Sequence, residues 1–204
     1  MHLVLQTNCP GYQNSVNWKY THIVKRWEAI ENQPELREWA EELQAYSLPR
    51  WEELPDFELY LDQTLNLLDR YLSVFKNDES ETLVTSSMVH NYVKLKLIPK
   101  PVKKRYTRKH LAYLIAITIL KQVLTIPEIK KGIMHQASVS GTREAYDLFC
   151  REQEYALRRS ASYLLAHTLD VCPPHEEDYL MLMRNAAMAA AAKVVAQKIL
   201  TTIP

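Results

Sequence analysis

Glycine occurs only three times in this chain of 204 residues, and regular alternation of apolar and polar residues is nearly absent. Such alternation marks half-buried strands, so its absence indicates a helical protein. Hydrophobic residues make up 47% of the chain and no low-complexity run interrupts them, which indicates a folded protein. The predicted fold class is all-α.

Cysteine is equally scarce, with Cys9, Cys150 and Cys172 as an odd and widely spaced set. Such a set argues against a disulfide framework. Cys172 and His175 form the only local pairing of zinc-ligand residues, and a zinc site would need a second pair that we do not find in the sequence. We therefore predict no metal site and no cofactor, and interpret Cys-Pro-Pro-His as a helix breaker beside a buried thiol.

Long hydrophobic runs and catalytic motifs are also missing. The longest apolar run, residues 111–120, is about half of what a membrane span needs, and residues 1–10 lack the features of a signal peptide. No nucleophile elbow, phosphate loop or paired-carboxylate motif is present. Acidic groups at 52–53 and 176–178 are explained by a connector and by a helix N-terminus. We expect a cytoplasmic protein that is not an enzyme and does not bind a membrane.

Acidic residues are absent from residues 82–127, which contain 9 Lys/Arg and therefore carry a formal charge of +9. Residues 1–81 hold 7 Lys/Arg against 15 Asp/Glu, a charge of −8, and residues 128–204 hold 9 of each. The overall charge of +1 thus hides a basic block, residues 82–127, beside an acidic segment. Such an asymmetry is expected of a surface that binds a polyanion.

Apolar spacing predicts the helices on either side of the basic block. One helix is expected over about 23–46, with a break or restart at Pro34. Another is expected after Asp56 as its N-cap, with a continuous apolar stripe. That stripe comprises Phe57, Leu61, Leu65, Leu68, Leu72 and Phe75. Residues 132–141 are predicted as a connector, followed by two long helices over about 142–170 and 175–200.

Within the basic block, Thr85 is expected to cap a short helix that ends near Leu95. Prolines cannot continue a helix, so residues 99–106 are predicted as an extended or hairpin-like excursion. Thr107 then caps a helix that is apolar nearly all round, as buried central helices are. A brief helix with Pro127 in its first turn follows.

This order of elements predicts a winged helix-turn-helix, which lays its second helix in the major groove of DNA. Asn91 can pair with adenine, His90 can donate to phosphate or guanine, and Tyr106 can pack against sugar or bond to phosphate. The predicted DNA-binding residues are Ser86, Ser87, His90, Asn91, Lys94, Lys100, Lys103, Lys104, Arg105, Tyr106, Arg108 and Lys109. The alternative interpretation of the basic residues is a solvated charged loop; the lack of acidic partners within the block favours DNA.

The stretch Thr85-Ser-Ser-Met-Val-His-Asn-Tyr-Val-Lys-Leu-Lys-Leu-Ile-Pro-Lys-Pro, followed by Arg105-Tyr-Thr-Arg-Lys-His-Leu, resembles the N-terminal domain of MerR-type regulators. In that family a recognition helix leads through a Gly-Leu-Ile/Leu-x-Pro segment into a wing, and a further helix pair follows. The residues that fit this pattern are Tyr92, Leu97, Ile98, Pro99, Tyr106 and 125–129. Three residues depart from it, since His90, Asn91 and Lys96 stand where the family has arginine, tyrosine and glycine. The wing is also several residues shorter.

Residues 54–133 are more closely similar to a bacterial family called domain of unknown function 1836. Its members carry the same Asn-Tyr-Val-Lys and Leu-Ile-Pro-Lys-Pro elements, and they are described only as candidate regulators. Together the resemblances imply a transcriptional regulator that binds double-stranded DNA.

We therefore predict an acidic helical segment (1–53), a winged helix-turn-helix domain (54–134) and a C-terminal helical region (135–204) for dimerisation or ligand sensing. MerR-like regulators dimerise through C-terminal helices, which implies a homodimer here, although an intramolecular helical hairpin fits the pattern equally well. If these helices hold a pocket for a small-molecule effector, Tyr155, Tyr163, Met181 and Met183 could line it, although aromatic and methionine residues at helical spacing are more often part of a hydrophobic core. The alternative function is a protein-interaction module of the same fold, whose basic block is covered by the acidic segment.

Overall fold

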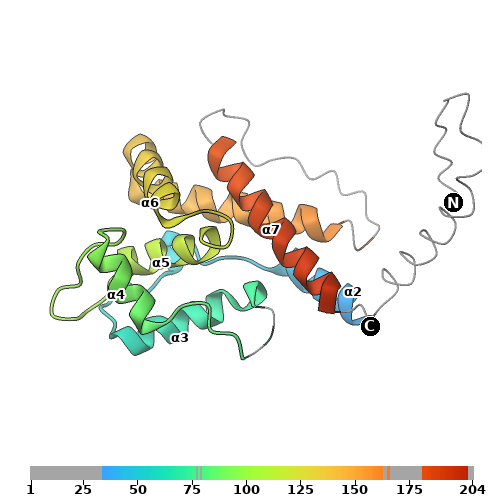
Figure 1. Ribbon diagram of the computed structural model, residues 1–204, viewed down its shortest axis with the longest axis horizontal. Coiled ribbons are helices and arrows are strands. Elements are labelled where there is room, and N and C mark those ends of the chain that lie inside the picture. Colours follow the sequence, from blue (N-terminus) through green and yellow to red (C-terminus); the bar gives the residue numbers. More distant parts are fainter. Residues whose placement is uncertain (1–33, 77, 79, 163–164, 166–180, 202–204) are drawn as a thin grey trace, which may run out of the picture.

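The computed structural model describes residues 34–76, 78, 80–162, 165 and 181–201. In these residues the secondary structure consists of helices and two isolated β-bridges (Figure 1). The α-helices are α2 (Pro34–Ala45), α3 (Leu61–Tyr71), α4 (Ser86–Lys94), α5 (Arg108–Leu120), α6 (Ile126–Ser162) and α7 (Met181–Thr201), with short 3-10 helices η1 (Trp51–Glu53) and η2 (Ser73–Phe75). The predicted all-α class is confirmed for this part of the chain.

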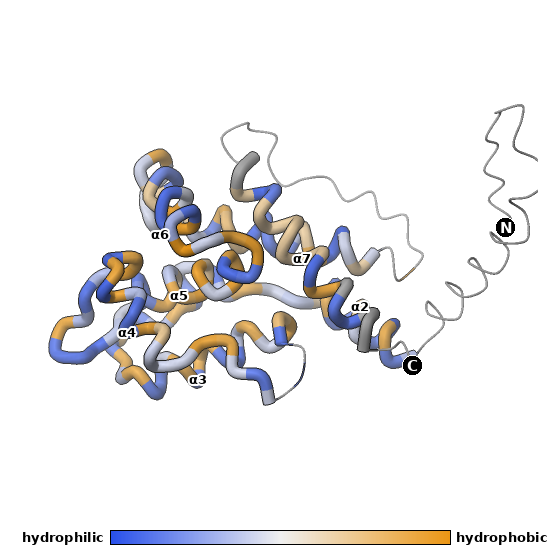
Figure 2. The backbone as a smooth tube through the Cα atoms, in the orientation of Figure 1, coloured by the Kyte–Doolittle hydropathy of each residue, from blue (hydrophilic) through white to orange (hydrophobic). Residues whose placement is uncertain are grey.

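Helix α5 is the centre of the fold. It packs against α3 on one side and against α6 and α7 on the other (Figure 1). Its residues are buried on every side, from His110 through Leu120, with Tyr113 half-buried. The tube of Figure 2 shows this hydrophobic helix enclosed between the others. The prediction of a buried central helix, drawn from a sequence that is apolar all round, is confirmed.

Helix α6 is longer than the sequence indicated and is bent at Gly141. The predicted connector at 132–141 is wrong, because the backbone stays helical from Ile126 through Ser140. Gly141 alone leaves the helical region, with φ 79° and ψ 161°, a left-handed conformation that suits glycine. Ile129 and Gln136 are buried in the first part of α6, and this burial holds the segment helical in spite of Gly132.

Helix α7 packs along α6 within the same chain, and α2 packs against α6 as well. The C-terminal helical hairpin is thus present in one molecule. Two acidic residues of α6 are buried. Glu152 accepts from the Arg184 guanidinium of α7 at 3.0 Å, and Glu154 pairs with Arg50, which lies between α2 and η1, at 2.6 Å. Neither buried carboxylate was expected from the apolar pattern of the helix.

The N-terminal boundary of α3 differs from the prediction. Asp56 does not cap a helix; α3 begins at Leu61, with Tyr60 at the N-cap position. The reason is a tertiary contact: Leu59 forms a β-bridge with Tyr106, in which each backbone N–H donates to the other residue's carbonyl at 2.8 Å. These bonds keep Leu59 and the residues before it out of the helix, and Phe57, expected on the buried stripe, is 63% exposed.

Other predictions for the flanking helices fall partly outside the described residues. Helix α2 is described from Pro34 onward, so the predicted break or restart at Pro34 stays a prediction. Residues 23–33 and 166–180, with Cys172 and His175, are not among the described ones. Buried hydrophobic side chains from the described parts of all three predicted segments contribute to one hydrophobic cluster. None of the helices in the described part is both long enough and apolar enough to span a membrane.

Candidate nucleic-acid interface

Helix α4 has one buried face and one exposed polar face. Its N-cap is Thr85, as predicted, whose hydroxyl accepts from the Met88 backbone N–H at 3.3 Å. Val89 and Tyr92 are buried and fix the helix on the core. The exposed residues of the opposite face are Ser86, Ser87, His90, Asn91 and Lys94. All five are predicted DNA contacts, and the structure places them together on one short helix.

The C-terminus of α4 is closed by a Schellman motif. The backbone N–H of Leu97 donates to the Tyr92 carbonyl at 2.9 Å, and that of Lys96 donates to the Val93 carbonyl at 3.0 Å. Lys96 occupies the left-handed position of this motif with φ 53°. Glycine is the usual residue there, and glycine is what the MerR pattern has at this place. Lys96 thus adopts the left-handed backbone conformation that glycine adopts more easily.

A minimal hairpin follows α4. Val102 and Arg105 form a β-bridge, and the Arg105 N–H donates to the Val102 carbonyl at 2.8 Å. Lys103 and Lys104 between them have φ 48° and 60°, the pattern of a type I′ hairpin turn. Such turns favour Asn-Gly, so two lysines here are unusual. The prediction of a hairpin-like excursion is confirmed, and the Leu59 bridge anchors its base to the residues before α3.

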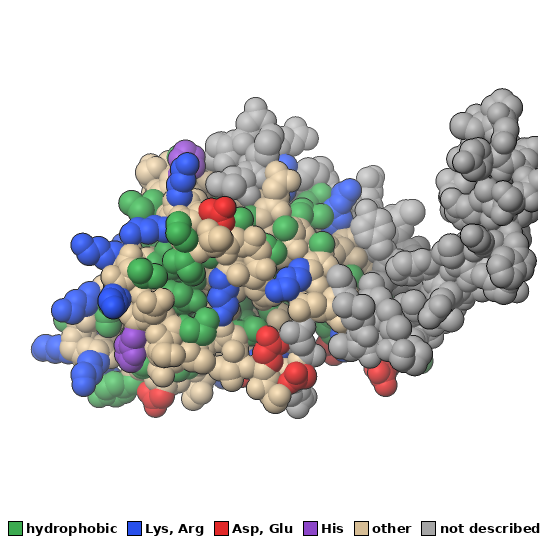
Figure 3. Space-filling model, viewed as in Figure 1, with side chains coloured by type: hydrophobic (Ala, Val, Ile, Leu, Met, Phe, Trp, Pro, Cys, Tyr) green, Lys and Arg blue, Asp and Glu red, His purple; other side chains and the backbone are tan. Residues whose placement is uncertain are grey.

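Five lysines of this region form an exposed cluster without acidic partners among the described residues. Lys94, Lys100, Lys103, Lys104 and Lys109 are all exposed. Within the described part of the chain, no acidic side chain lies in ion-pair distance of these five lysines. Figure 3 shows Lys and Arg side chains gathered at the end of the molecule where α4 and the hairpin lie. Their charge is therefore available to an anion from outside the chain.

Three predicted contacts have a different place from the one expected. The prediction that Tyr106 contacts DNA at the surface is wrong, because the residue is 2% exposed and its ring packs edge-on against His110. Arg105 is half-buried, with its guanidinium 3.6 Å from the centre of the Tyr60 ring. Arg108 donates to the Leu54 carbonyl and to Glu52, each at 3.0 Å. Both arginines are thus engaged by residues that precede α3.

His110 holds the first turn of α5. Its Nδ1 accepts from the Thr107 backbone N–H at 3.0 Å, which places the proton of the neutral ring on Nε2. Burial lowers the pKa of His110 and nearby Lys109 lowers it further, whereas the Pro99 carbonyl raises it. The ring therefore stays neutral near pH 7 and acts as a capping group directly behind the hairpin.

Two lysines of the region were missed by sequence reasoning. Lys96 is exposed beside α4. Its position, where the MerR pattern has glycine, could have indicated a residue at the end of the helix with an exposed side chain. Lys130 of α6 donates to the Leu95 carbonyl at 3.0 Å, and so it joins α6 to the end of α4. Nothing in the local sequence indicates that second contact, which crosses 35 positions.

The described residues contain no group of three or more His, Cys, Asp or Glu side chains that could hold a metal ion. Comparison with curated proteins and with solved structures gave no match. Comparison with family models gave a match over residues 49–149. This stretch extends past residues 54–133 at both ends, and the structure offers a reason: Tyr146 donates to the Pro49 carbonyl at 2.7 Å, and Trp51 N–H donates to Asp147 at 2.8 Å. The matched family is described as Domain of unknown function (DUF1836), and the match over residues 49–149 supports the family that the sequence motifs indicate.

Proposed function

We propose that this protein is a transcriptional regulator that binds double-stranded DNA through α4 and the hairpin that follows it. In this proposal α3 and α4 are the helix pair of a MerR-like winged helix-turn-helix, residues 95–107 are the wing, and α5 with the first part of α6 is the helix pair behind it. A cytoplasmic location, where such a protein meets DNA, belongs to the same proposal.

The observation that carries the proposal is the set of exposed, unpaired lysines around the polar face of α4. Exposed cations with no protein partner repel one another, and a polyanion relieves that repulsion. Phosphate contacts by lysines fix the position of a protein on the duplex without reading sequence. The lysines of the hairpin suit this role, because their side chains are exposed at the tip of a projecting loop (Figure 1).

Sequence would be read by the outward face of α4. Asn91 offers an amide that can make two hydrogen bonds to adenine, and Ser86, Ser87 and His90 offer further donors. The proposal includes a homodimer, because two copies would bind a two-fold symmetric operator. Since α6 and α7 already pack on each other within one chain, two chains would meet through the exposed surface of that hairpin.

The test is the affinity of the full chain for labelled duplex DNA, measured by fluorescence anisotropy at low salt. Lys103→Ala with Lys104→Ala should weaken binding to all sequences alike. Asn91→Ala should instead relax the preference at one base pair, by about 1–3 kcal/mol of discrimination. Fragments selected from random DNA would give that preference and the symmetry of the site.

Absence of binding at low salt would overturn the proposal. The alternative, a protein-interaction module of the same fold, would then be favoured, since Glu52 already pairs with Arg108 of the basic block. Arg37→Ala with Arg151→Ala is the matched control, because it removes two cations from exposed positions outside the block. Its affinity should stay close to that of the unmodified chain.

A further inference from the structure

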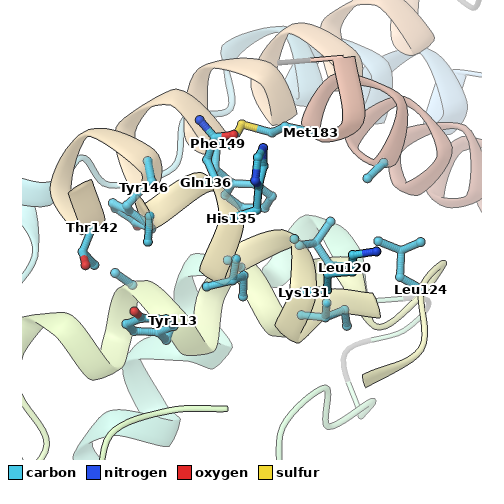
Figure 4. A pocket seen from close by; sticks show the side chains of 18 of the residues that line it. Tyr113, Leu120, Leu124, Lys131, His135, Gln136, Thr142, Tyr146, Phe149 and Met183 are labelled. Atoms are coloured by element: carbon cyan, nitrogen blue, oxygen red, sulfur yellow. The ribbon is translucent and has the colours of Figure 1, made fainter. Parts of the chain in front are cut away.

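A cavity of about 530 Å³ lies between α5, α6 and α7. Its wall comes from α5, from both parts of α6 on either side of the Gly141 bend, and from the first turns of α7 (Figure 4). Sites for small molecules have volumes of roughly 300–1,000 Å³ and form preferentially between such elements. The cavity is therefore large enough for a small organic ligand.

The cavity is open because small residues stand where these helices face one another. The small residues of its wall are Ala112, Ala116, Gly132, Ala137, Ala145 and Ala186. Tyr113, Phe149 and Met183 line it as larger apolar or aromatic groups (Figure 4). The charged residues of the wall, Glu128 and Lys131, are exposed and of opposite sign. An interior of this kind favours an uncharged and mainly apolar molecule.

Gln136 adds a specific polar feature. The residue is 7% exposed, and its Nε2 has no hydrogen-bond partner among the described residues. Figure 4 shows Gln136 among the side chains that line the cavity, next to Met183. A buried donor without a partner is unfavourable, so an acceptor oxygen brought in by a ligand would stabilise it.

We propose that this cavity binds an uncharged, mainly apolar small molecule with one acceptor oxygen that takes a hydrogen bond from the Gln136 amide. Of the four residues that the sequence suggested for a pocket, Met183 lines the cavity and the buried Tyr155 does not. Tyr163 and the side chain of Met181 lie outside the described residues. The proposal is independent of DNA binding, because it concerns occupancy of the cavity alone.

The first test uses prodan, an uncharged fluorescent naphthalene ketone, titrated into the full chain. We expect saturable binding of one prodan per chain, with the blue shift that an apolar site produces. Ala116→Phe, which fills the cavity, should weaken binding at least about tenfold, which is about 1.4 kcal/mol. Val139→Phe is the matched control, because Val139 is exposed and outside the wall, and it should bind prodan as the unmodified chain does.

The second test examines the hydrogen bond. Gln136→Met keeps the size of the side chain but removes the amide, so prodan should bind about tenfold more weakly. Dimethylaminonaphthalene, which lacks the ketone, should bind both proteins equally. If Ala116→Phe proves unfolded by circular dichroism, Ala137→Leu gives the same comparison at another position of the wall.

Lack of saturable binding would overturn the proposal, and so would equal affinity of Ala116→Phe and Val139→Phe for prodan. A stable dimer in sedimentation that excludes prodan would overturn it as well, since a second copy of the chain would then cover the cavity. If Gln136→Met lowered the affinity for prodan and for its ketone-free analogue equally, the ketone would not accept a hydrogen bond from Gln136. That result would contradict the proposal.

Discussion

Three lysines, Lys96, Lys103 and Lys104, adopt the left-handed backbone conformation that usually belongs to glycine or asparagine. They are the only residues other than glycine that do so in the described part of the chain. Each such residue costs roughly 1–2 kcal/mol in its backbone. The Schellman motif and the hairpin turn require this conformation, but folding does not favour lysine in it, and such residues often occur at functional positions. All three lysines are exposed and surround α4, which is consistent with a binding role for their side chains.

Lys96→Gly should raise the free energy of unfolding by about 1 kcal/mol, because glycine adopts the left-handed conformation without a clash of its Cβ. Urea unfolding followed by circular dichroism measures the change. Lys94→Gly, two residues earlier in the helix, is the control and should lower the free energy of unfolding by about 1 kcal/mol. A loss of stability in Lys96→Gly would contradict the Schellman motif at this helix end.

His110 should make the stability of the protein depend on pH. Burial lowers the pKa of the folded state below the usual value of 6.5, so the unfolded chain binds a proton more readily. The free energy of unfolding is therefore not reduced by His110 above about pH 6.5. It decreases as the pH falls from there towards the pKa of His110 in the folded state. Urea unfolding at neutral and mildly acidic pH should show this decline.

His110→Gln should reduce that decline. Glutamine at this position can still accept from the Thr107 N–H in an ordinary capping box, but it does not titrate. The stability near neutral pH should thus be kept while the acid sensitivity becomes smaller. His90→Gln, at an exposed position of α4, is the control and should leave the decline unchanged. An equal decline in His110→Gln would mean that other groups cause it.

Helix boundaries were predicted correctly where they depend on residues close in the sequence, such as a capping side chain. Thr85 and Thr107 cap helices as expected, and the prolines lie in the non-helical segment between α4 and α5, as their lack of a backbone N–H predicts. The start of α3 could not be predicted, since it depends on the bridge between Leu59 and Tyr106, 47 positions apart (106 less 59). Gly132 was expected to interrupt a helix, and only burial of the helix face around it shows why it does not.

The hairpin provides a prediction that separates stability from binding. Lys103→Asn with Lys104→Gly supplies the residues that a type I′ turn favours, so the free energy of unfolding should rise by about 1–2 kcal/mol. The same change removes two cations, and the affinity for duplex DNA should fall about tenfold or more at moderate salt. Chemical unfolding and anisotropy titrations on the same preparation measure both effects. DNA binding as tight as in the unmodified chain would exclude the hairpin from the interface.

For the whole molecule, the candidate interface was visible in the sequence because its residues lie within one block of the chain. Nine of the twelve predicted contacts are exposed residues of the capped helix or lysines of the hairpin and the start of α5, which short-range features of the sequence indicate. The places of Arg105, Tyr106 and Arg108 were not predicted, since their partners Tyr60, His110, Leu54 and Glu52 are brought to them by the folded chain. The cavity could not be predicted from the sequence either, because its wall is formed by residues of α5, α6 and α7 that only the folded chain brings together.

The salt dependence of DNA binding should report how many chains bind together. Six exposed lysines, at positions 94, 96, 100, 103, 104 and 109, can each neutralise one phosphate. The logarithm of the binding constant should then fall against the logarithm of salt concentration with a slope of about −5.4 for one chain and about −10.8 for two. Anisotropy titrations from low to moderate salt give this slope, and sedimentation of the free protein shows whether the dimer forms before binding. A slope near zero would contradict phosphate contact altogether, because release of counterions is what makes such binding sensitive to salt.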